Sequence, residues 1–550
     1  MTHDLPGPAA RPARGHGPVP ASPAPAAEGV GRAAGRMGAA TLVSRVTGLL
    51  RETASAALFG LGPVSDAFVF AFRIPNLLRE FFAEGALSSA FVPVFARARE
   101  REGDAQAFVL ARRVLGTLAV VTGLLAGLGI VFAPQVVGLV AQDAPEQVRP
   151  LTVTLTRIMF PFLALAAMAA VAMGVLNTHR RYFLPALAPA AFNVVAVVGG
   201  GVLLWLALPA EQAVLAWAGL VLLGGVAQVL VQVPALRQVG WQGAPSVDLR
   251  LRDPRLREVV RRMGPVVLAL AGTNVMVLIT TALASRGEGW ATGLSLAFRL
   301  VHLPIGLVGV SIGTVVLAAG ARSHAAGDAA GVEQAVQRGL RLSWFLAAPA
   351  AVGLAVMAEP LVRMVYGHGR FAQGEGVALT ADALLWYAAA VVAYAGVKSS
   401  VALFMVRGDT RTPAWCSLAG ILANLAVAYG ALEAFPPGRG YRALALAVVV
   451  GTSVNFLLLR VLGRWRHGAG SAPGAGYVAR VLLAAGGMGA AALGLLRVLP
   501  PPGLLLTLCL CAGLGVLYML LAGLLGLPEA GQVARRLGLR GGRGPGEATP

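Results

Sequence analysis

The chain has 550 residues, of which 57% are hydrophobic and 13% are charged, and its mean hydropathy is +0.73. Soluble globular domains carry about 25% charged residues, so this composition excludes an ordinary soluble protein. The formal charge of +20 would suggest nucleic acid in a soluble chain. No basic tract is interleaved with aromatic residues on which bases could stack, and we therefore assign no nucleic-acid partner.

The predicted elements begin after a Pro-, Ala- and Gly-rich segment, residues 1–36, which lacks an apolar core and is predicted to be a disordered cytoplasmic arm rather than a signal peptide. Apolar runs of roughly 20 residues, the length of a bilayer-spanning helix, then recur almost to the C-terminus. The fold class is therefore an all-α polytopic membrane protein with about 14 transmembrane helices. The predicted spans are 37–60, 66–95, 106–135, 150–177, 183–208, 212–236, 258–285, 292–320, 338–366, 379–406, 412–434, 441–463, 477–498 and 502–526.

Arginine distribution predicts the orientation of these spans. With the N-terminus inside the cell, arginines crowd nearly every inside loop and the outside loops keep few, as the positive-inside rule requires. Both termini are then cytoplasmic, and residues 528–550 form a basic cytoplasmic tail. The outside loops are all short, so no extracellular domain is expected that could host catalysis.

A weak internal repeat suggests two lobes. Residues 71–74 (AFRI) resemble residues 297–300 (AFRL), and a proline follows each, Pro75 and Pro304. The two segments lie six spans apart and run in the same direction, a plan known among transporters. We predict an N-lobe of six helices (37–237), a C-lobe of six helices (255–466) and two further C-terminal helices (475–527).

Charged residues inside the spans are the main indication of a site. An arginine at the bilayer centre costs about 2.5–3.5 kcal/mol even on the lenient insertion scale. Several together are expected to line a hydrated cavity between the lobes. The charged residues concerned are Arg45, Arg51 and Glu52 in the first span, Arg73, Arg79, Glu80 and Glu84 in the second, and Arg299 in the eighth.

Helical spacing places several of these residues on common faces. Arg45 and Glu52 are seven apart, as are Ser44 and Arg51, and Asn76 lies three residues before Arg79. Arginine presents a planar fork of donors that matches phosphate, and arginines outnumber acids here, so the pattern favours an anionic, phosphorylated ligand. The alternative is structural: Arg45–Glu52 and Arg73–Glu80 would be internal ion pairs that hold helices together.

Other polar residues have simpler interpretations. His302 lies close to Arg299, where it could pair with an anion, titrate or be structural. Lys398 lies within the tenth span and is equally well explained by packing or snorkelling. Asp66 begins the second span and is expected to cap it. The three cysteines form no C-x-x-C or Cys/His cluster, so no metal site, disulfide or cofactor is predicted.

At the first two spans the sequence resembles a known family. The segments are Ser44–Glu52 (SRVTGLLRE), Asp66–Phe68 (DAF), Arg73–Arg79 (RIPNLLR) and Ala83–Ala86 (AEGA), with Ala90–Pro93 (AFVP) after them. They resemble the MurJ (MviN) family of lipid II flippases, and weaker matches extend the resemblance over roughly 37 to 526. It implies the fold of the multidrug/oligosaccharidyl-lipid/polysaccharide (MOP) exporter superfamily, in which two six-helix lobes surround a cationic cavity. It also implies that helices 475–527 form a groove for a polyprenyl tail.

The resemblance implies a function in peptidoglycan biosynthesis, and hence in cell wall and cell shape. The chain would carry lipid II, the undecaprenyl-pyrophosphate-linked precursor, across the bacterial inner membrane from the cytoplasmic to the periplasmic leaflet. Its partners would be lipid II and membrane lipids, and the peptidoglycan synthesis machinery is a further candidate partner. No ATP-binding loop is present, so the membrane potential, an ion gradient or downstream consumption of the transported lipid would drive transport.

By motif position, the resemblance assigns substrate binding to four arginines, Arg45, Arg51, Arg79 and Arg299, and Asp66 and Glu84 match the acidic positions of the family. Helical spacing and proximity to these arginines add four further supporting residues: Ser44, Glu52, Asn76 and His302. Phe298 and His302 depart from the family, because polar or acidic residues often flank the Arg299 position there.

Three other functions remain open at this stage. A flippase for another polyprenyl-linked glycan would bind its phosphorylated lipid with the same kind of cationic cavity. A cation-drug exporter of the same fold would need a cavity of negative charge. A membrane glycosyltransferase would need an outward-facing acidic residue on a substantial loop, whereas the outside loops here are short. The sequence therefore favours a transporter over an enzyme.

Overall fold

The computed structural model describes residues 27–81, 86–306, 310–436, 438–467 and 473–536, and within them the regular structure is entirely helical. Nine of the described helices are long and apolar enough to cross a membrane, and ten if α17 and α18, bent by 42° at their junction, count as one span. Each of the fourteen predicted spans overlaps one or two helices, which confirms the all-α polytopic fold.

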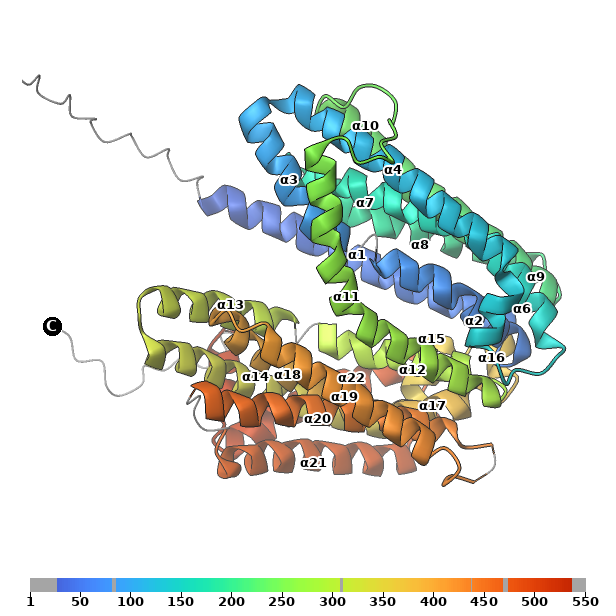
Figure 1. The fold of residues 1–550 in the computed structure, drawn as a ribbon. Helices are drawn as coiled ribbons and strands as arrows, with labels where there is room; N and C mark the ends of the chain where they lie inside the picture. The colour runs from blue at the N-terminus through green and yellow to red at the C-terminus, as the bar shows by residue number, and fades with distance from the viewer. Residues whose placement is uncertain (1–26, 82–85, 307–309, 437, 468–472, 537–550) are drawn as a thin grey trace, which may run out of the picture.

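The N-lobe occupies the first part of the chain, coloured blue to blue-green in Figure 1. Its helices are α1 (Ala27–Phe59), α2 (Pro63–Arg79), α3 (Ala86–Glu102), α4 (Asp104–Val131), α5 (Ala133–Val140), α6 (Val148–Met159), α7 (Phe162–Thr178), α8 (Phe183–Trp205), α9 (Ala210–Leu230) and α10 (Val233–Gln238). Some predicted spans are broken in two. Pro161 marks one such break, between α6 and α7, because proline cannot donate the helical hydrogen bond.

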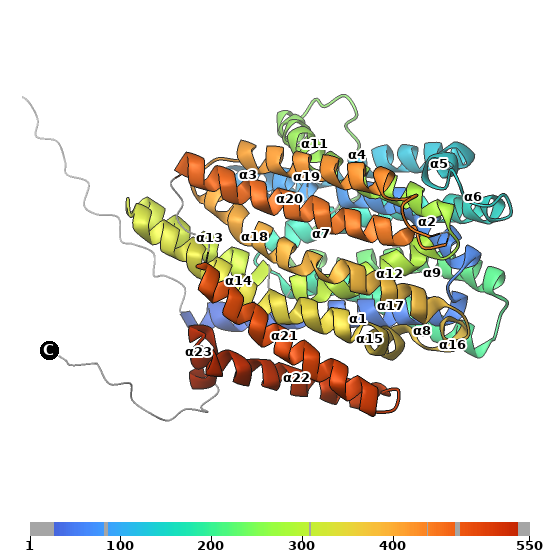
Figure 2. The same ribbon diagram turned by 90° about the horizontal axis from the view of Figure 1, so that it is seen from below.

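The C-lobe follows α11 (Pro254–Leu283). Its elements are η2 (Ala284–Arg286), α12 (Trp290–Pro304), α13 (Val310–Ala325), α14 (Ala329–Val356), α15 (Ala358–Tyr366), α16 (Gly369–Ala372), α17 (Gly376–Ala388), α18 (Ala390–Val406), α19 (Arg411–Gly430) and α20 (Tyr441–His467). Three helices complete the chain: α21 (Ala475–Val498), α22 (Leu504–Leu524) and α23 (Pro528–Arg536). Figure 2 shows these three along one side of the C-lobe, where they share an apolar core with Phe345 and Ala348 of α14.

The N-lobe has its own buried core, whereas the C-lobe core also takes in N-lobe residues such as Ala56, Phe70 and Val137, and α11 contributes to both cores. Leu256 and Val259, near the start of α11, pack in the N-lobe core. Leu283, at its end, belongs to the C-lobe core together with residues of α12 and α17. The predicted C-lobe, 255–466, therefore begins with a helix whose first turns are part of the N-lobe.

The first helix begins earlier than expected. α1 starts at Ala27, so residues 27–36 are helical rather than part of a disordered arm. The segment AEGVGRAAGR holds three alanines but also three glycines, so its own helix propensity is weak, and the long helix that follows supplies the nucleus from which it extends. Residues 1–26, the larger part of the predicted arm, lie outside the described chain, as do residues 537–550 of the predicted tail.

The two lobes converge at one end and diverge at the other. In Figure 1 they meet at the right, near α2, α12 and α16, and separate toward the left, where α1 begins and α13 lies. The described chain therefore begins at the end where the lobes are apart.

An arginine–carboxylate cluster, which we call the α11 cluster, ties the start of α11 to the N-lobe. Asp253 caps α11 by accepting a hydrogen bond from the Arg255 backbone N–H at 2.9 Å, and it pairs with Arg113 of α4 at 2.7 Å. Arg255 also reaches Glu102 of α3 at 2.7 Å. An open pocket of about 860 Å³ borders this cluster, whose carboxylates are already engaged by arginines of the chain.

Asp253 should stabilise the protein at every pH above about 4. Burial alone would raise its pKa, but hydrogen bonds from Arg255 and Arg113 outweigh burial and lower the pKa to about 2. Because the pKa of Asp253 is depressed in the folded state, its contribution to the free energy of unfolding is complete above the unfolded pKa of about 3.9. This stabilisation is lost as the pH falls through about 2.

We therefore expect Asp253→Ala to lower the thermal unfolding temperature in detergent at pH 7 by about 1–2 °C, the size expected when a chain of this length loses a helix cap of about 1 kcal/mol. The matched control is Glu359→Ala, which removes an exposed i,i+4 pair with Arg363 and should have almost no effect. Equal shifts for the two variants, or a stability difference that changes between pH 5 and 8, would contradict this assignment.

Candidate functional site

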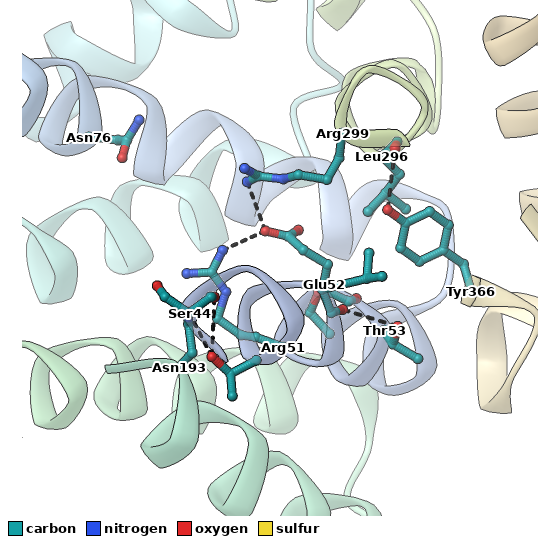
Figure 3. Close-up of polar contacts among 12 residues, drawn as sticks. Ser44, Arg51, Glu52, Thr53, Asn76, Asn193, Leu296, Arg299 and Tyr366 are labelled. Carbon is teal, nitrogen blue, oxygen red and sulfur yellow. Dashed lines mark hydrogen bonds and ion pairs between the residues drawn. The ribbon is translucent and has the colours of Figure 1, made fainter. Parts of the chain in front are cut away.

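One carboxylate between the lobes is shared by two arginines. Arg51 and Glu52 are neighbours on α1, and the Arg51 guanidinium donates to Glu52 Oε1 at 2.5 Å. Arg299 of α12 reaches across from the C-lobe and donates to the same oxygen at 2.9 Å. Figure 3 shows the two guanidinium groups converging on Glu52. Two cations and one anion leave this group with a net positive charge.

One side chain of this group is accessible to solvent. The Arg299 side chain is 54% exposed although it contacts the opposite lobe, whereas Glu52 is 19% exposed. Ser295, Arg299 and His302 are the exposed residues of the last turns of α12, and their i, i+4, i+7 spacing puts them on one face. This face of α12 and the facing part of α1 define what we call the interlobe cleft.

Arg45 adds a third guanidinium to the cleft. Its side chain is exposed, and a Cβ at Gly306, two residues beyond α12, would come within 2.3 Å of a guanidinium nitrogen. Arg45 therefore lies against the C-lobe from its position on α1. Across the described part of the chain it makes no hydrogen bond or ion pair, so its donors are available to a ligand.

The N-lobe holds α1 in place behind these arginines. Asn193 of α8 donates to the Ser44 carbonyl at 3.1 Å, and the Arg51 guanidinium lies 5.4 Å from the centre of the Phe192 ring. The aromatic face attracts the cation and restricts its orientation. Ser44 therefore contributes its backbone, not its hydroxyl, to the contacts seen here.

A second polar group lies on α2. Arg79 donates from Nε to the Asn76 side-chain oxygen at 3.1 Å, and the Asn76 amide donates to Glu80 at 2.9 Å. Figure 3 shows Asn76 set apart from the Arg299–Glu52 pair. Arg73, one turn earlier, is partly buried, and its Nε has no hydrogen-bond partner among the described residues.

At the converging end, Asp66 joins the two lobes. It is buried at the start of α2, yet its carboxylate bonds to the C-lobe rather than to its own helix. It accepts from the backbone N–H of Gly289 at 2.6 Å, from that of Thr292 at 2.9 Å and from the Thr292 hydroxyl at 2.7 Å. Asp66 therefore caps α12 across the lobe interface. The prediction that it caps the second span is wrong, because α2 is capped locally by Ser65, which bonds to Gly62.

Arg370 of α16 makes the reciprocal contact from the C-lobe. It donates to the Leu58 carbonyl, near the end of α1, and to the Leu208 carbonyl between α8 and α9, each at 2.6 Å. Cations are favoured at helix C-termini, where carbonyls lack partners. Gly369 has φ +54° and lies so close to α1 that a Cβ would stand 2.6 Å from the Ala57 carbonyl oxygen. Only glycine suits this position.

The structure thus brings Arg51, Glu52 and Arg299 together, with Arg45 nearby, as the cavity hypothesis expects. The Arg45–Glu52 ion pair of the structural alternative is not formed, because Glu52 is occupied by Arg51 and Arg299. His302 is exposed on the same face as Arg299. Glu84 lies outside the described residues. Their roles in binding stay predictions.

Several contributing residues were missed by sequence analysis. Asn193 is a polar residue inside an apolar span, a signal that could have been used. Gly289, Thr292 and Arg370 could not have been found, because their partners lie on the other lobe. Among the described residues, no group of three or more His, Cys, Asp or Glu side chains could hold a metal ion.

Two helical lobes that meet at one end around an arginine-lined cleft define a two-lobed polytopic membrane transporter. Solved structures share this fold. One, a lipid II flippase MurJ in an inward closed conformation, superposes with a TM-score of 0.73 at 20% identity, covering 92% of this chain and 99% of that one. An inward-facing multidrug resistance MATE transporter of the MOP superfamily gives a TM-score of 0.64 at 16% identity, covering 77% of this chain and 95% of that one.

Sequence comparison narrows the class. The family model for lipid II flippase MurJ matches residues 55–511. The lipid II flippase MurJ of Burkholderia cenocepacia is 36% identical over 426 residues, which cover 76% of this chain and 81% of the relative. A probable lipid II flippase MurJ of Rhizobium meliloti is 36% identical over 471 residues, covering 83% and 84%. The chain belongs to the MurJ family of lipid II flippases.

Proposed function

We propose that this protein is a flippase that translocates lipid II from the cytoplasmic to the periplasmic leaflet of the bacterial inner membrane, and that it is not an enzyme. The observation that carries the proposal is the cationic interlobe cleft, in which Arg45, Arg51 and Arg299 outnumber Glu52. Guanidinium groups bind pyrophosphate oxygens through paired, charge-assisted hydrogen bonds. The family membership supplies the identity of the lipid.

The proposed binding step is an exchange of partners. A pyrophosphate entering the cleft competes with Glu52 for the N–H groups of Arg299 and Arg51, while Arg45 offers donors with no partner to displace. The head group lies in the open cleft, and the polyprenyl tail stays in the lipid, with α21 and α22 proposed as its guide.

The proposed orientation places the open end toward the cytoplasm. Positive-inside loops put the N-terminus in the cytoplasm, and α1 begins at the end where the lobes diverge. Release outside then requires the contacts of Asp66 and Arg370 to break as the cytoplasmic ends approach. The membrane potential is a candidate driving force, worth about 2.3 kcal/mol per elementary charge per 100 mV.

The test is complementation of a bacterium depleted of its own lipid II flippase, read out by the accessibility of lipid II at the outer leaflet. Wild type should restore both growth and accessibility. We expect Arg299→Ala or Arg51→Ala to reduce flipping by about 10- to 100-fold, because a hydrogen bond to a charged group contributes about 1.5–3 kcal/mol. Arg363→Ala is the matched control, since that side chain is 50% exposed and paired within its own helix.

Two results would count against the proposal. Wild-type flipping by both Arg51→Ala and Arg299→Ala at normal expression would remove the cleft from the mechanism. Failure of the wild-type chain to expose lipid II, together with rescue of a strain lacking a different polyprenyl-linked glycan flippase, would reassign the substrate.

A further inference from the structure

An aromatic cluster borders Arg299 on the C-lobe wall of the cleft. Phe298 and His302 are neighbours on α12, with ring centres 4.3 Å apart. The Phe298 ring lies 5.3 Å from Tyr387 of α17 and 6.3 Å from Tyr394 of α18, and His302 lies 6.2 Å from Tyr394. We call Phe298, His302, Tyr387 and Tyr394 the ring cluster.

Part of the ring cluster is open to the cleft. His302 is exposed and follows Arg299 by three residues, so it lies on the same face of α12 about 4.5 Å further along the axis. Phe298 and Tyr394 are half-buried, whereas Tyr387 is 4% exposed and backs the others. His302 is therefore the exposed member of the ring cluster, and Phe298 and Tyr394 each expose part of their side chains.

Hydrogen-bonding groups rim these rings. His302 Nδ1 lies 3.1 Å from the Phe298 carbonyl oxygen, which assigns the proton of the neutral ring to Nδ1 and leaves Nε2 as a free acceptor. Lys398 is exposed on α18, one turn after Tyr394, and is among the charged neighbours of His302. Aromatic faces next to one acceptor and one donor suit a ligand that is apolar on one face and hydroxylated at its edges.

We propose that the ring cluster, with Lys398, is the subsite for the sugar attached to the pyrophosphate of the transported lipid. This inference rests on the proposed function and deepens it. The C–H groups on one face of a pyranose carry partial positive charge and stack on the negative face of an aromatic ring. The sugar hydroxyls at the ring edge can bond to His302 Nε2 and Lys398.

Covalent connectivity selects the sugar over the rest of the substrate. The sugar is bonded directly to the pyrophosphate, so phosphates held by Arg299 and Arg51 place it beside those arginines. Within the ring cluster, Phe298 adjoins Arg299 in the sequence, and His302 lies about one helical turn from Arg299 on the same face of α12. The polyprenyl chain leaves the pyrophosphate on the opposite side and remains in the lipid, and the peptide lies beyond the sugar.

The experiment measures binding of two probes to the full chain in lipid nanodiscs: undecaprenyl pyrophosphate and the same lipid carrying one sugar. Wild type should bind the glycosylated probe more tightly. Phe298→Leu and His302→Ala should each lower the affinity for the glycosylated probe by about fivefold and leave the affinity for the bare probe unchanged. His302→Phe, which keeps a ring, should retain most of the preference. Arg299→Ala should lower the affinity for both probes.

Tyr429→Leu is the control, because Tyr429 is an exposed tyrosine on α19 outside the ring cluster. Equal loss for both probes in Phe298→Leu and His302→Ala would show that the rings only position Arg299, and would overturn the subsite. Equal affinity of wild type for the two probes would overturn it as well, and lipid II flipping in depleted cells would then show whether the proposed function still stands. Failure of wild type to bind either probe would refute the proposed function itself.

Discussion

Replacing Asp66 by alanine should open the end of the molecule where the lobes meet. The carboxylate is buried and accepts three hydrogen bonds from Gly289 and Thr292 of the other lobe. Its loss leaves two buried backbone N–H groups and a hydroxyl without partners, and removing one partner of a buried charged hydrogen bond costs about 2–5 kcal/mol. The penalty falls on the converged state, because these contacts exist only while the lobes touch there.

The measurement is the labelling rate of a cysteine placed at Leu61, which lies against Gly289 at this interface, by a membrane-impermeant maleimide. The background has Cys416, Cys509 and Cys511 replaced by alanine. We expect Asp66→Ala to increase the rate by at least tenfold and Asp66→Asn, which keeps one acceptor oxygen, to have a smaller effect. An unchanged rate in Asp66→Ala would mean that these hydrogen bonds do not hold the end closed.

Replacing Glu52 by glutamine should separate binding from transport. Glu52 neutralises part of the cleft and is the bridge between Arg51 on α1 and Arg299 on α12. Without its charge, a pyrophosphate no longer competes for these guanidinium groups. We expect undecaprenyl pyrophosphate to bind about tenfold more tightly, equal to about 1.4 kcal/mol.

Flipping by Glu52→Gln should nevertheless fall by about tenfold, because tighter binding without a matching gain at release slows the cycle. Both quantities can be measured, the first by binding in nanodiscs and the second by lipid II accessibility in depleted cells. Glu359→Gln, on a surface pair outside the cleft, should change neither. Weaker binding in Glu52→Gln would show that the carboxylate serves chiefly to hold the arginines in position.

The sequence by itself determined the class, the family and most of the helices. Hydropathy is a local property, and a run of about 20 apolar residues must be helical in a bilayer because every backbone polar group needs a partner. The cost of burying charge in a membrane likewise indicates, from the sequence alone, that Arg45, Arg51 and Arg299 are candidate cavity-lining residues. The start of α1 at Ala27 was not predicted, because residues 27–36 contain no apolar run that hydropathy could detect.

Only the tertiary structure decided which charges meet. The spacing of seven residues on α1 offered Arg45 as the partner of Glu52 in the ion-pair alternative, whereas the cross-lobe partner, Arg299, lies 247 residues away. Asp66 finds its partners 223 and 226 residues away, on a helix of the other lobe. These pairings depend on how the two lobes are rotated and translated against each other. That arrangement follows from the summed packing of many side chains, so it cannot be predicted from any local pattern of residues.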